Sequence, residues 1–240
     1  MGARQSSARA TTTRSRDDDE FSGYRFHAVC GANVALSPDR RTAMRRRSFK
    51  DGVVFSDRPL RPRETFEIEI VALEREWVGS LRFGLTARNP TGPSPPPPFA
   101  VPILTGKPGT YVLAGCAVHG TVDEATTVSW IRDGYALNLD DLGEIKEGTR
   151  LGVLYDPFGR LIFTVDGNER GVACEGLPHD VPLFAVLDIY GRAKAVRVMQ
   201  SRQVSSLQDL CRLVIQRNVA ESRNVDELTL PRNLKRFLKC

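Results

Sequence analysis

The chain has 240 residues, of which 41% are hydrophobic and 26% are charged, and its formal net charge is +5 at pH 7. This composition is that of a globular protein of one or two domains, and it excludes collagen-like and wholly disordered chains. No stretch approaches the roughly 18 uninterrupted apolar residues of a membrane-spanning helix, and we expect no secretory signal peptide.

Five cysteines are scattered along the chain. They are Cys30, Cys116, Cys174, Cys211 and Cys240. Their number is odd, and no pair has the C-x-x-C spacing of a zinc site or a redox motif. We therefore predict free thiols in a reducing, cytoplasmic compartment, with no bound metal and no cofactor.

Basic residues outnumber acidic ones, 34 against 29, but the two are mixed along the chain. This distribution does not indicate nucleic-acid binding, and we expect no nucleic-acid partner. We favour a solvated loop over an anion-binding patch for the densest basic cluster. That cluster consists of Arg40, Arg41, Arg45, Arg46, Arg47 and Lys50.

The N-terminal segment is poor in hydrophobic side chains and rich in Arg, Ser, Thr and Asp, which predicts disorder over residues 1–20. The chain begins Met-Gly-Ala-Arg-Gln-Ser, which fits the M-G-x-x-x-[ST] pattern for myristoylation of Gly2. A single acyl chain binds membranes only marginally. The pattern therefore predicts a weak, partial association with membranes.

Residues 24–199 consist of short segments in which hydrophobic and polar side chains alternate. Residues 66–70 alternate with period two, and residues 81–85 and 161–165 repeat the pattern. The turn sequence Asp166-Gly167-Asn168 predicts a tight hairpin after the last of these. Many short strands with regular turns predict a mainly β fold, an antiparallel β-sandwich, for one domain over residues 21–200.

The hydrophobic period changes after residue 200. Apolar side chains then recur at i, i+3, i+4, i+7 and i+8, which places them on one stripe of a helix. A second short stripe follows, with Pro231 suited to the first turn of its helix. The tail over residues 201–240 is too short for a core of its own, so it predicts a small α-helical unit that docks on the sandwich or on a partner.

No catalytic or nucleotide-binding motif is present in the sequence. His27, His119 and His179 belong to no recognisable constellation, and no pair of carboxylates stands out from the others. We therefore predict a protein without catalytic activity of its own.

The tail resembles a SOCS box, because residues 206–215 read as a small polar residue, Leu, three residues, Cys and then aliphatic residues. In that family this helix binds the elongin B–elongin C heterodimer, and the residues so implied are Leu207, Leu210, Cys211, Val214 and Ile215. The second part resembles the family's Leu-Pro-Leu-Pro box, with Thr229 in place of the first proline. It implies binding to cullin-5, with its RING protein, through Leu228, Leu230, Pro231, Leu234, Phe237 and Leu238.

The preceding sandwich resembles a neuralized homology repeat over nearly all of residues 24–199. The resemblance is carried by residues 31–34, 77–86 and 182–191, among others. The family fold is a twisted antiparallel sandwich related to SPRY domains, in agreement with the period-two pattern. Together the two resemblances imply a substrate-recognition adaptor of an elongin BC–cullin-5–RING E3 ubiquitin ligase, in which the repeat binds a target protein.

Binding residues of a sandwich are expected on loops at one end, where exposed aromatic and Arg side chains make good anchors. The candidates lie in three loops. They are Arg45, Arg46, Arg47 and Phe49 in the first, Tyr155 and Phe158 in the second, and Tyr190 in the third. Trp77, Phe83 and Phe163 are predicted to lie in the core instead.

A second hypothesis is a membrane-associated adaptor without a role in a ligase. Myristoylated Gly2 and the basic cluster of residues 40–50 would then bind anionic lipid. The tail helices would pack on the sandwich, so the two hypotheses differ in what the stripe of residues 207–215 contacts.

Overall fold

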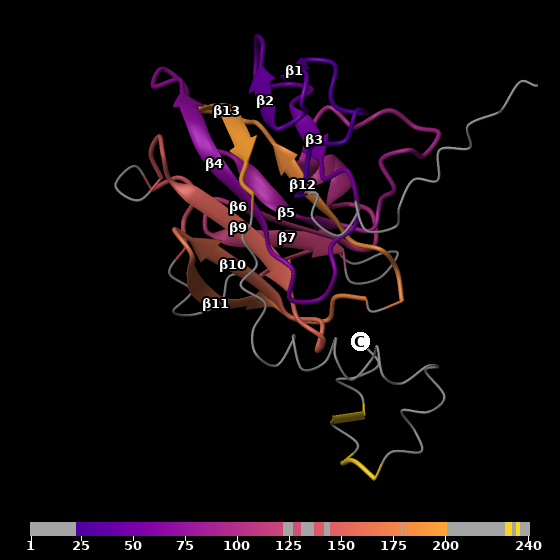
Figure 1. Ribbon diagram of the computed structural model, residues 1–240. Helices are drawn as coiled ribbons and strands as arrows, with labels where there is room; N and C mark the ends of the chain where they lie inside the picture. Colours follow the sequence, from indigo (N-terminus) through magenta and orange to yellow (C-terminus); the bar gives the residue numbers. More distant parts are fainter. Residues whose placement is uncertain are drawn as a thin grey trace, which may run out of the picture.

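The computed structural model describes residues 23–121, 127–130, 137–141, 145–178, 180–200, 229–231 and 234–235. These residues form two antiparallel sheets, which confirms the predicted mainly β sandwich (Figure 1). The larger sheet has the order β1 (Val34–Leu36), β2 (Thr42–Arg45), β13 (Ala193–Val198), β4 (Phe66–Leu73), β9 (Arg150–Tyr155), β10 (Leu161–Val165), β11 (Asn168–Cys174). The smaller sheet has the order β3 (Val53–Phe55), β12 (Phe184–Asp188), β5 (Arg82–Thr86), β6 (Thr110–Ala114), β7 (Ala117–Thr121), β8 (Thr127–Trp130).

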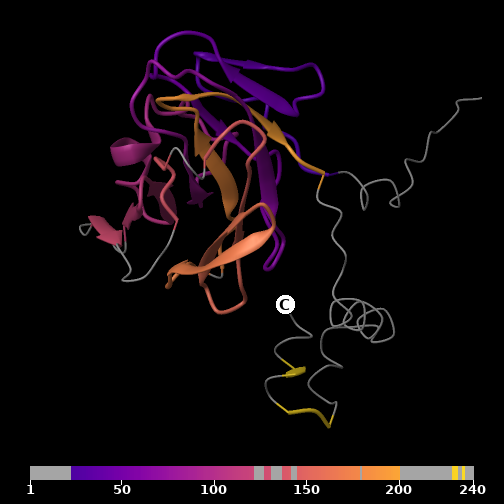
Figure 2. The same cartoon turned by 90° about the vertical axis from the view of Figure 1, so that its left-hand side faces the viewer.

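The main core lies between the two sheets, which Figure 2 shows as two layers. Strand β4 buries Phe66, Ile68 and Ile70, as its period-two pattern predicts. The ring centroid of Phe66 is 6.4 Å from that of Phe83 on β5, and Phe83 is 6.0 Å from Phe163 on β10. Phe83 and Phe163 are therefore core residues, as predicted, and burial of each such side chain contributes about 1.5–3 kcal/mol.

The hairpin between β10 and β11 is also confirmed. Val165 pairs with Asn168 across a two-residue turn. The φ angles of the turn residues Asp166 and Gly167 are +49° and +80°. Two positive φ angles are the mark of a type I′ turn, whose twist matches that of the strands it joins.

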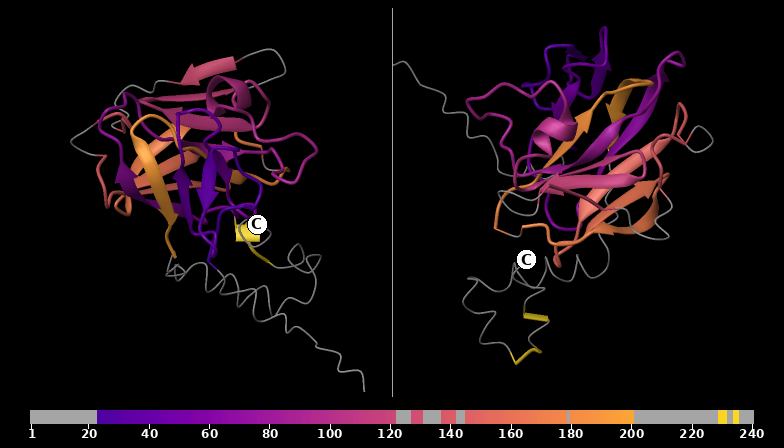
Figure 3. Two further views of the ribbon diagram at one scale, coloured as in Figure 1. Left: turned by 90° about the horizontal axis from the view of Figure 1, so that it is seen from above. Right: turned by 180° about the vertical axis from the view of Figure 1, so that it is seen from behind.

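A short helical segment, η1 (Ala100–Leu104), covers part of the outer face of the smaller sheet (Figure 3). Its Ala100 and Leu104 are buried in a second, smaller core. The strand residues of this core are Val53, Phe55, Val112 and Val186. The long β5–β6 connection is thereby fixed beside the strand ends that carry Arg82 and Asp188.

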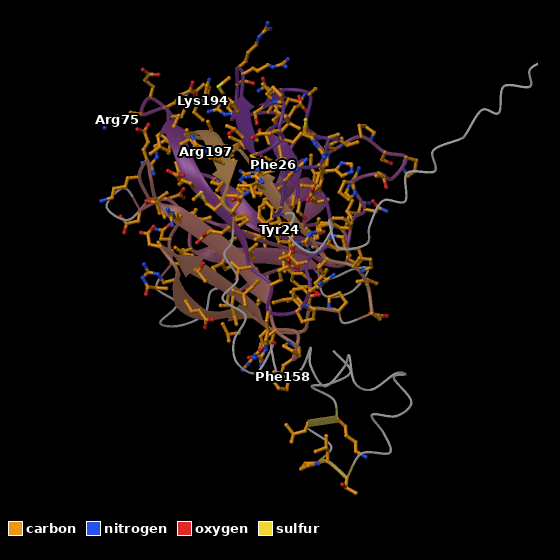
Figure 4. The ribbon with its side chains drawn as sticks, in the orientation of Figure 1. Tyr24, Phe26, Arg75, Phe158, Lys194 and Arg197 are labelled. Carbon is orange, nitrogen blue, oxygen red and sulfur yellow. The ribbon has the colours of Figure 1, made fainter. Side chains whose placement is uncertain are left out.

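One end of the sandwich holds the points at which the chain enters and leaves it, and the other end holds three of the loops between strands. The described chain enters at Gly23 and leaves at Gln200, which lie next to each other. The Met199 amide donates to the Glu67 carbonyl oxygen at 2.9 Å, so the exit lies at the start of β4. The β2–β3, β4–β5 and β12–β13 loops lie at the other end, and Figure 4 shows Arg75 and Lys194 there, far from Phe158.

Candidate functional site

Arg45 is the point at which three loops are joined. Its side chain is fully buried at the end of β2. The guanidinium donates to the carbonyl oxygens of Arg47 and Gly191, both at 2.7 Å, and to the Glu74 carboxylate at 2.8 Å. These acceptors belong to the β2–β3, β12–β13 and β4–β5 loops respectively. The prediction that Arg45 is an exposed anchor for a target is therefore wrong, because the planar guanidinium satisfies buried groups from all three loops.

Glu74 extends this network toward the surface. Its carboxylate accepts from the Lys194 ammonium at 2.6 Å as well as from Arg45. The hydrogen bond from Lys194, followed by the charge of Arg45, lowers the pKa of Glu74 from its usual value. Glu74 is therefore ionised at neutral pH and balances the buried charge of Arg45.

The β2–β3 loop is also held by Asn33. The Asn33 side-chain amide donates to the carbonyl oxygens of Ser48 at 2.6 Å and Lys50 at 3.0 Å. The Asn33 side-chain oxygen accepts from the Arg47 backbone amide at 3.0 Å. The loop that presents Phe49 is thus fixed by side-chain hydrogen bonds on both sides of that residue.

Four aromatic side chains from different loops meet at this end of the sandwich, and we call this group the aromatic surface: Phe49, Trp77, Phe99 and Tyr190. Phe49 lies at the centre of the group, with ring centroids 5.6 Å from Trp77, 6.1 Å from Phe99 and 5.5 Å from Tyr190. It is still 37% exposed. The Arg45 guanidinium lies 5.6 Å from the Trp77 ring centroid, which adds a cation–π contact beneath the surface.

A buried ion pair supports the aromatic surface from the smaller sheet. Arg82 and Asp188 are cross-strand partners on β5 and β12, and their side chains are 3.5 Å apart. Asp188 accepts from the Ala100 amide at 2.9 Å, and Arg82 donates to the Val101 carbonyl oxygen at 2.8 Å. The Arg82 guanidinium also stacks on Tyr190, 3.8 Å from its ring centroid. The pair thus fixes the segment that carries Phe99.

Burial raises the pKa of Asp188 to about 6, and the Ala100 amide and Arg82 only partly oppose this shift. One oxygen, Oδ1, has no hydrogen-bond partner among the described residues. Asp188 is therefore a carboxylate whose charge is costly and is retained at neutral pH by Arg82.

A pocket of about 220 Å³ lies beside Tyr190. It is lined by Gly79, Ser80, Arg82, Gly115, Asp140 and Tyr190, among others. The Ser80 hydroxyl is buried and has no hydrogen-bond partner among the described residues. The volume is below the roughly 300–1,000 Å³ of small-molecule sites. The pocket therefore fits one side chain of a bound protein better than a cofactor.

The structure brings together only part of the predicted target-binding set. Phe49 and Tyr190 meet in the aromatic surface, and Arg46 and Arg47 are exposed in the same loop as Phe49. Tyr155 lies at the opposite end, is 8% exposed, and donates its hydroxyl to the Leu60 carbonyl oxygen at 3.1 Å. The prediction that Tyr155 is an exposed anchor is therefore wrong.

Phe158 lies on the β9–β10 turn and is 60% exposed. Its turn is at the end of the sandwich opposite to Arg75 and Lys194 (Figure 4). Arg160 covers one face of the ring, 5.2 Å from its centroid. Phe158 is an exposed loop residue, as predicted, but it does not converge with Phe49 and Tyr190.

The sequence does not indicate the role of three residues at this end of the sandwich. Trp77, assigned to the core, is half-buried in the aromatic surface. Phe99 follows a run of four prolines, and Arg82 alternates with core residues on β5. The sequence signal that could have identified Phe99 as a surface residue is its position directly after a proline-rich loop. The corresponding signal for Trp77 is its position in a turn sequence that ends in Gly79.

Most of the predicted tail residues lie outside the described part of the chain, as does Gly2. The tail residues outside it are Leu207, Leu210, Cys211, Val214, Ile215, Leu228, Phe237 and Leu238. Leu230 is half-buried, while Pro231 and Leu234 are exposed. The amides of Leu234 and Lys235 both donate to the Pro231 carbonyl oxygen, at 3.0 and 3.1 Å.

Neither a metal site nor a membrane-spanning helix is found among the residues that the structure describes. Among them, no group of three or more His, Cys, Asp or Glu side chains is arranged to hold a metal ion. No helix in that part of the chain is long and apolar enough to cross a membrane.

Comparison with known proteins agrees with this architecture. Residues 26–200 match the Neuralized family, and residues 203–239 match the SOCS box family. The chain is 35% identical to the human protein "Neuralized-like protein 2", over 90% of this chain and 91% of that protein. It is 34% identical to the mouse protein of the same name, with the same coverage.

Solved structures show the same fold. The crystal structure of the neuralized NHR1 domain of Drosophila melanogaster has a TM-score of 0.61 and 26% identity, and it covers 75% of this chain and 99% of that one. The solution structure of the NHR domain of Neuralized from the same organism has a TM-score of 0.60, and it covers 80% of this chain and 97% of that one. The chain therefore belongs to the neuralized family, with a Neuralized domain that is followed by a SOCS box.

Proposed function

We propose that this protein is the substrate-recognition adaptor of an elongin BC–cullin-5–RING E3 ubiquitin ligase. A Neuralized domain joined to a SOCS box is the arrangement of an adaptor in the ubiquitin pathway. Some relatives are themselves named E3 ubiquitin-protein ligases, such as human "E3 ubiquitin-protein ligase NEURL3", which is 33% identical over 73% of this chain. The pairing of the two domains is the observation that carries the proposal.

The aromatic surface is the part of the Neuralized domain that we propose to bind the target. It combines a half-exposed aromatic platform with a side-chain-sized pocket whose Ser80 hydroxyl is unpartnered. Its loops are fixed by Arg45, Asn33 and the Arg82–Asp188 pair, so little conformational entropy is lost when a target binds.

The adaptor itself is proposed to be non-catalytic. It would act by holding the target near the ubiquitin carrier that is recruited by cullin-5 and its RING protein, which raises the effective concentration of the reacting groups. A cytoplasmic location goes with this role. Myristoylation of Gly2 stays a prediction, which incorporation of a labelled fatty acid into wild type and Gly2→Ala would decide.

Co-purification with elongin B and elongin C tests the ligase role. Wild type should form a stoichiometric complex, and Leu207→Ala/Cys211→Ala should lose it, because an amphipathic helix binds its partner through one apolar stripe. The matched control is Asp209→Ala/Gln216→Ala, which alters the opposite side of the same predicted helix and should leave the complex intact.

Addition of cullin-5 and, in parallel, cullin-2 tests the finer assignment. Cullin-5 should join the purified complex and cullin-2 should not, and Pro231→Ala/Leu234→Ala should weaken this step without affecting the elongins. If wild type remains alone and monodisperse, the adaptor role is wrong and the membrane-associated alternative gains support.

A further inference from the structure

The aromatic surface is bordered by exposed basic side chains, which we call the basic rim: Arg46, Arg47, Lys50 and Arg75. All four are exposed. Phe49 lies between Arg47 and Lys50 in the β2–β3 loop, and Arg75 precedes Trp77 by two residues in the β4–β5 loop. None of the four forms an ion pair with another residue that the structure describes.

The acidic residues of the same loops offset only part of this charge. Glu74 is already shared between Arg45 and Lys194. Glu76 and Asp51 are the other carboxylates of these two loops, against four cations of the basic rim. The border of the aromatic surface therefore has an excess of uncompensated positive charge, which attracts an oppositely charged partner over several ångströms.

The aromatic side chains are arranged to receive a chain segment and not to enter a bilayer. Phe49 packs edge-on against Trp77 and Tyr190 and stacks on Phe99, so its ring is fixed within a platform. Binding to a membrane interface requires apolar side chains that are buried about 5–10 Å into the boundary of the headgroups. In these loops only Val78, at 91% exposure, projects in that way.

We infer that the target segment bound here is acidic: an apolar or aromatic side chain seats on the aromatic surface, and flanking Asp or Glu residues lie over the basic rim. This inference rests on the proposed function, and it names the chemical class of the target. The pocket itself does not take the acidic side chain, because the Asp140 carboxylate lines it and Asp188 lies behind Arg82. The acidic residues belong on the border, where charge governs association more than final affinity.

Selection from a displayed library of random peptides, with the full chain as bait, tests this inference. Selected peptides should carry an apolar or aromatic anchor with Asp or Glu on either side. A labelled selected peptide and its copy with Asn and Gln for Asp and Glu are then compared by fluorescence anisotropy. The neutral copy should bind about tenfold more weakly, and the difference should shrink as salt rises from about 50 to about 200 mM.

Two matched charge reversals locate the effect. Arg46→Glu/Arg47→Glu should slow association of the acidic peptide by about tenfold. Arg61→Glu/Arg63→Glu makes the same change of charge with two exposed arginines at the opposite end, beside Tyr155, and should change the rate less than about twofold. Equal effects of the two reversals would overturn the inference.

Phe49→Ala separates failure of this inference from failure of the proposed surface. Binding that is lost in Phe49→Ala but shows no acidic preference overturns the inference and leaves the surface in place. Peptide binding that survives Phe49→Ala contradicts the proposal that the aromatic surface binds the target. Failure to select any peptide also overturns the inference. Binding to phosphatidylserine vesicles through Arg46 and Arg47, in place of peptide binding, would instead indicate a membrane-binding surface.

Discussion

Replacement of Arg45 by Met should destabilise the folded protein far more than replacement of an exposed arginine. Met keeps much of the aliphatic stem but removes the guanidinium that donates to Gly191, Arg47 and Glu74. Loss of one partner from a buried charge network costs about 3–5 kcal/mol. Glu74 is one-quarter exposed and keeps Lys194, so the lower end of this range applies, about 3 kcal/mol.

The free energy of unfolding is measured by urea denaturation of the full chain, with tryptophan fluorescence as the signal that monitors unfolding. Arg47→Met is the control, because its side chain is exposed and its loss should change the free energy of unfolding by less than about 0.5 kcal/mol. Arg45→Met should also weaken target binding, since Trp77 and Phe49 lose the contact that joins their loops. A loss of stability below about 1 kcal/mol, or one equal to that of Arg47→Met, would refute the account of Arg45 as the joining residue.

Three further outcomes follow from buried groups. Because burial raises the folded pKa of Asp188 to about 6, against 3.8 in the unfolded chain, only the folded state binds a proton there between these values. The free energy of unfolding of wild type minus that of Asp188→Asn should therefore rise by about 2 kcal/mol as pH falls from 7 to 4, as measured by urea titrations, and a flat difference contradicts the raised pKa. Tyr155→Phe should lose about 1 kcal/mol of stability in denaturation, through its hydrogen bond to Leu60, and leave target binding unchanged. Gly84→Ala should lower stability by about 3 kcal/mol in a thermal melt, since a Cβ would overlap the Tyr111 carbonyl oxygen, and an unchanged melting temperature contradicts that close approach.

The sandwich was predictable from the sequence because some strands, such as β4, alternate between buried and more exposed side chains. Residues 66–70 alternate in sequence and in burial, and the Asp166-Gly167 turn adopts the backbone that its residue types favour. These signals are local, so they are present before any tertiary contact forms.

The candidate site was less predictable because its construction depends on contacts between distant residues. The sequence around Arg45 predicts a solvated charge, whereas its burial depends on acceptors from distant segments, among them the carbonyl oxygens of Gly191 and Ala193, nearly 150 residues away. Phe99 joins the aromatic surface because Ala100 is held by Asp188, 88 residues further along the chain. No local pattern specifies either contact, whereas Phe49 and Tyr190 follow a simple rule, because aromatic side chains in loops at the end of a sandwich are candidates for binding.

The arrangement of the two ends of the sandwich constrains how an adaptor of this kind works. The aromatic surface lies where β4 ends and β13 begins, at Glu74 and Gly191, whereas the described sandwich ends at Gln200, beside Gly23 and the start of β4. Eight residues of β4 span about 25 Å, so the target would be held at least that far from the point at which the tail begins. Because Arg45 and the Arg82–Asp188 pair fix the loops to both sheets, a bound target would be carried rigidly with the sandwich. If the proposed function holds, insertions or deletions after Gln200 should alter ubiquitin transfer without altering target affinity.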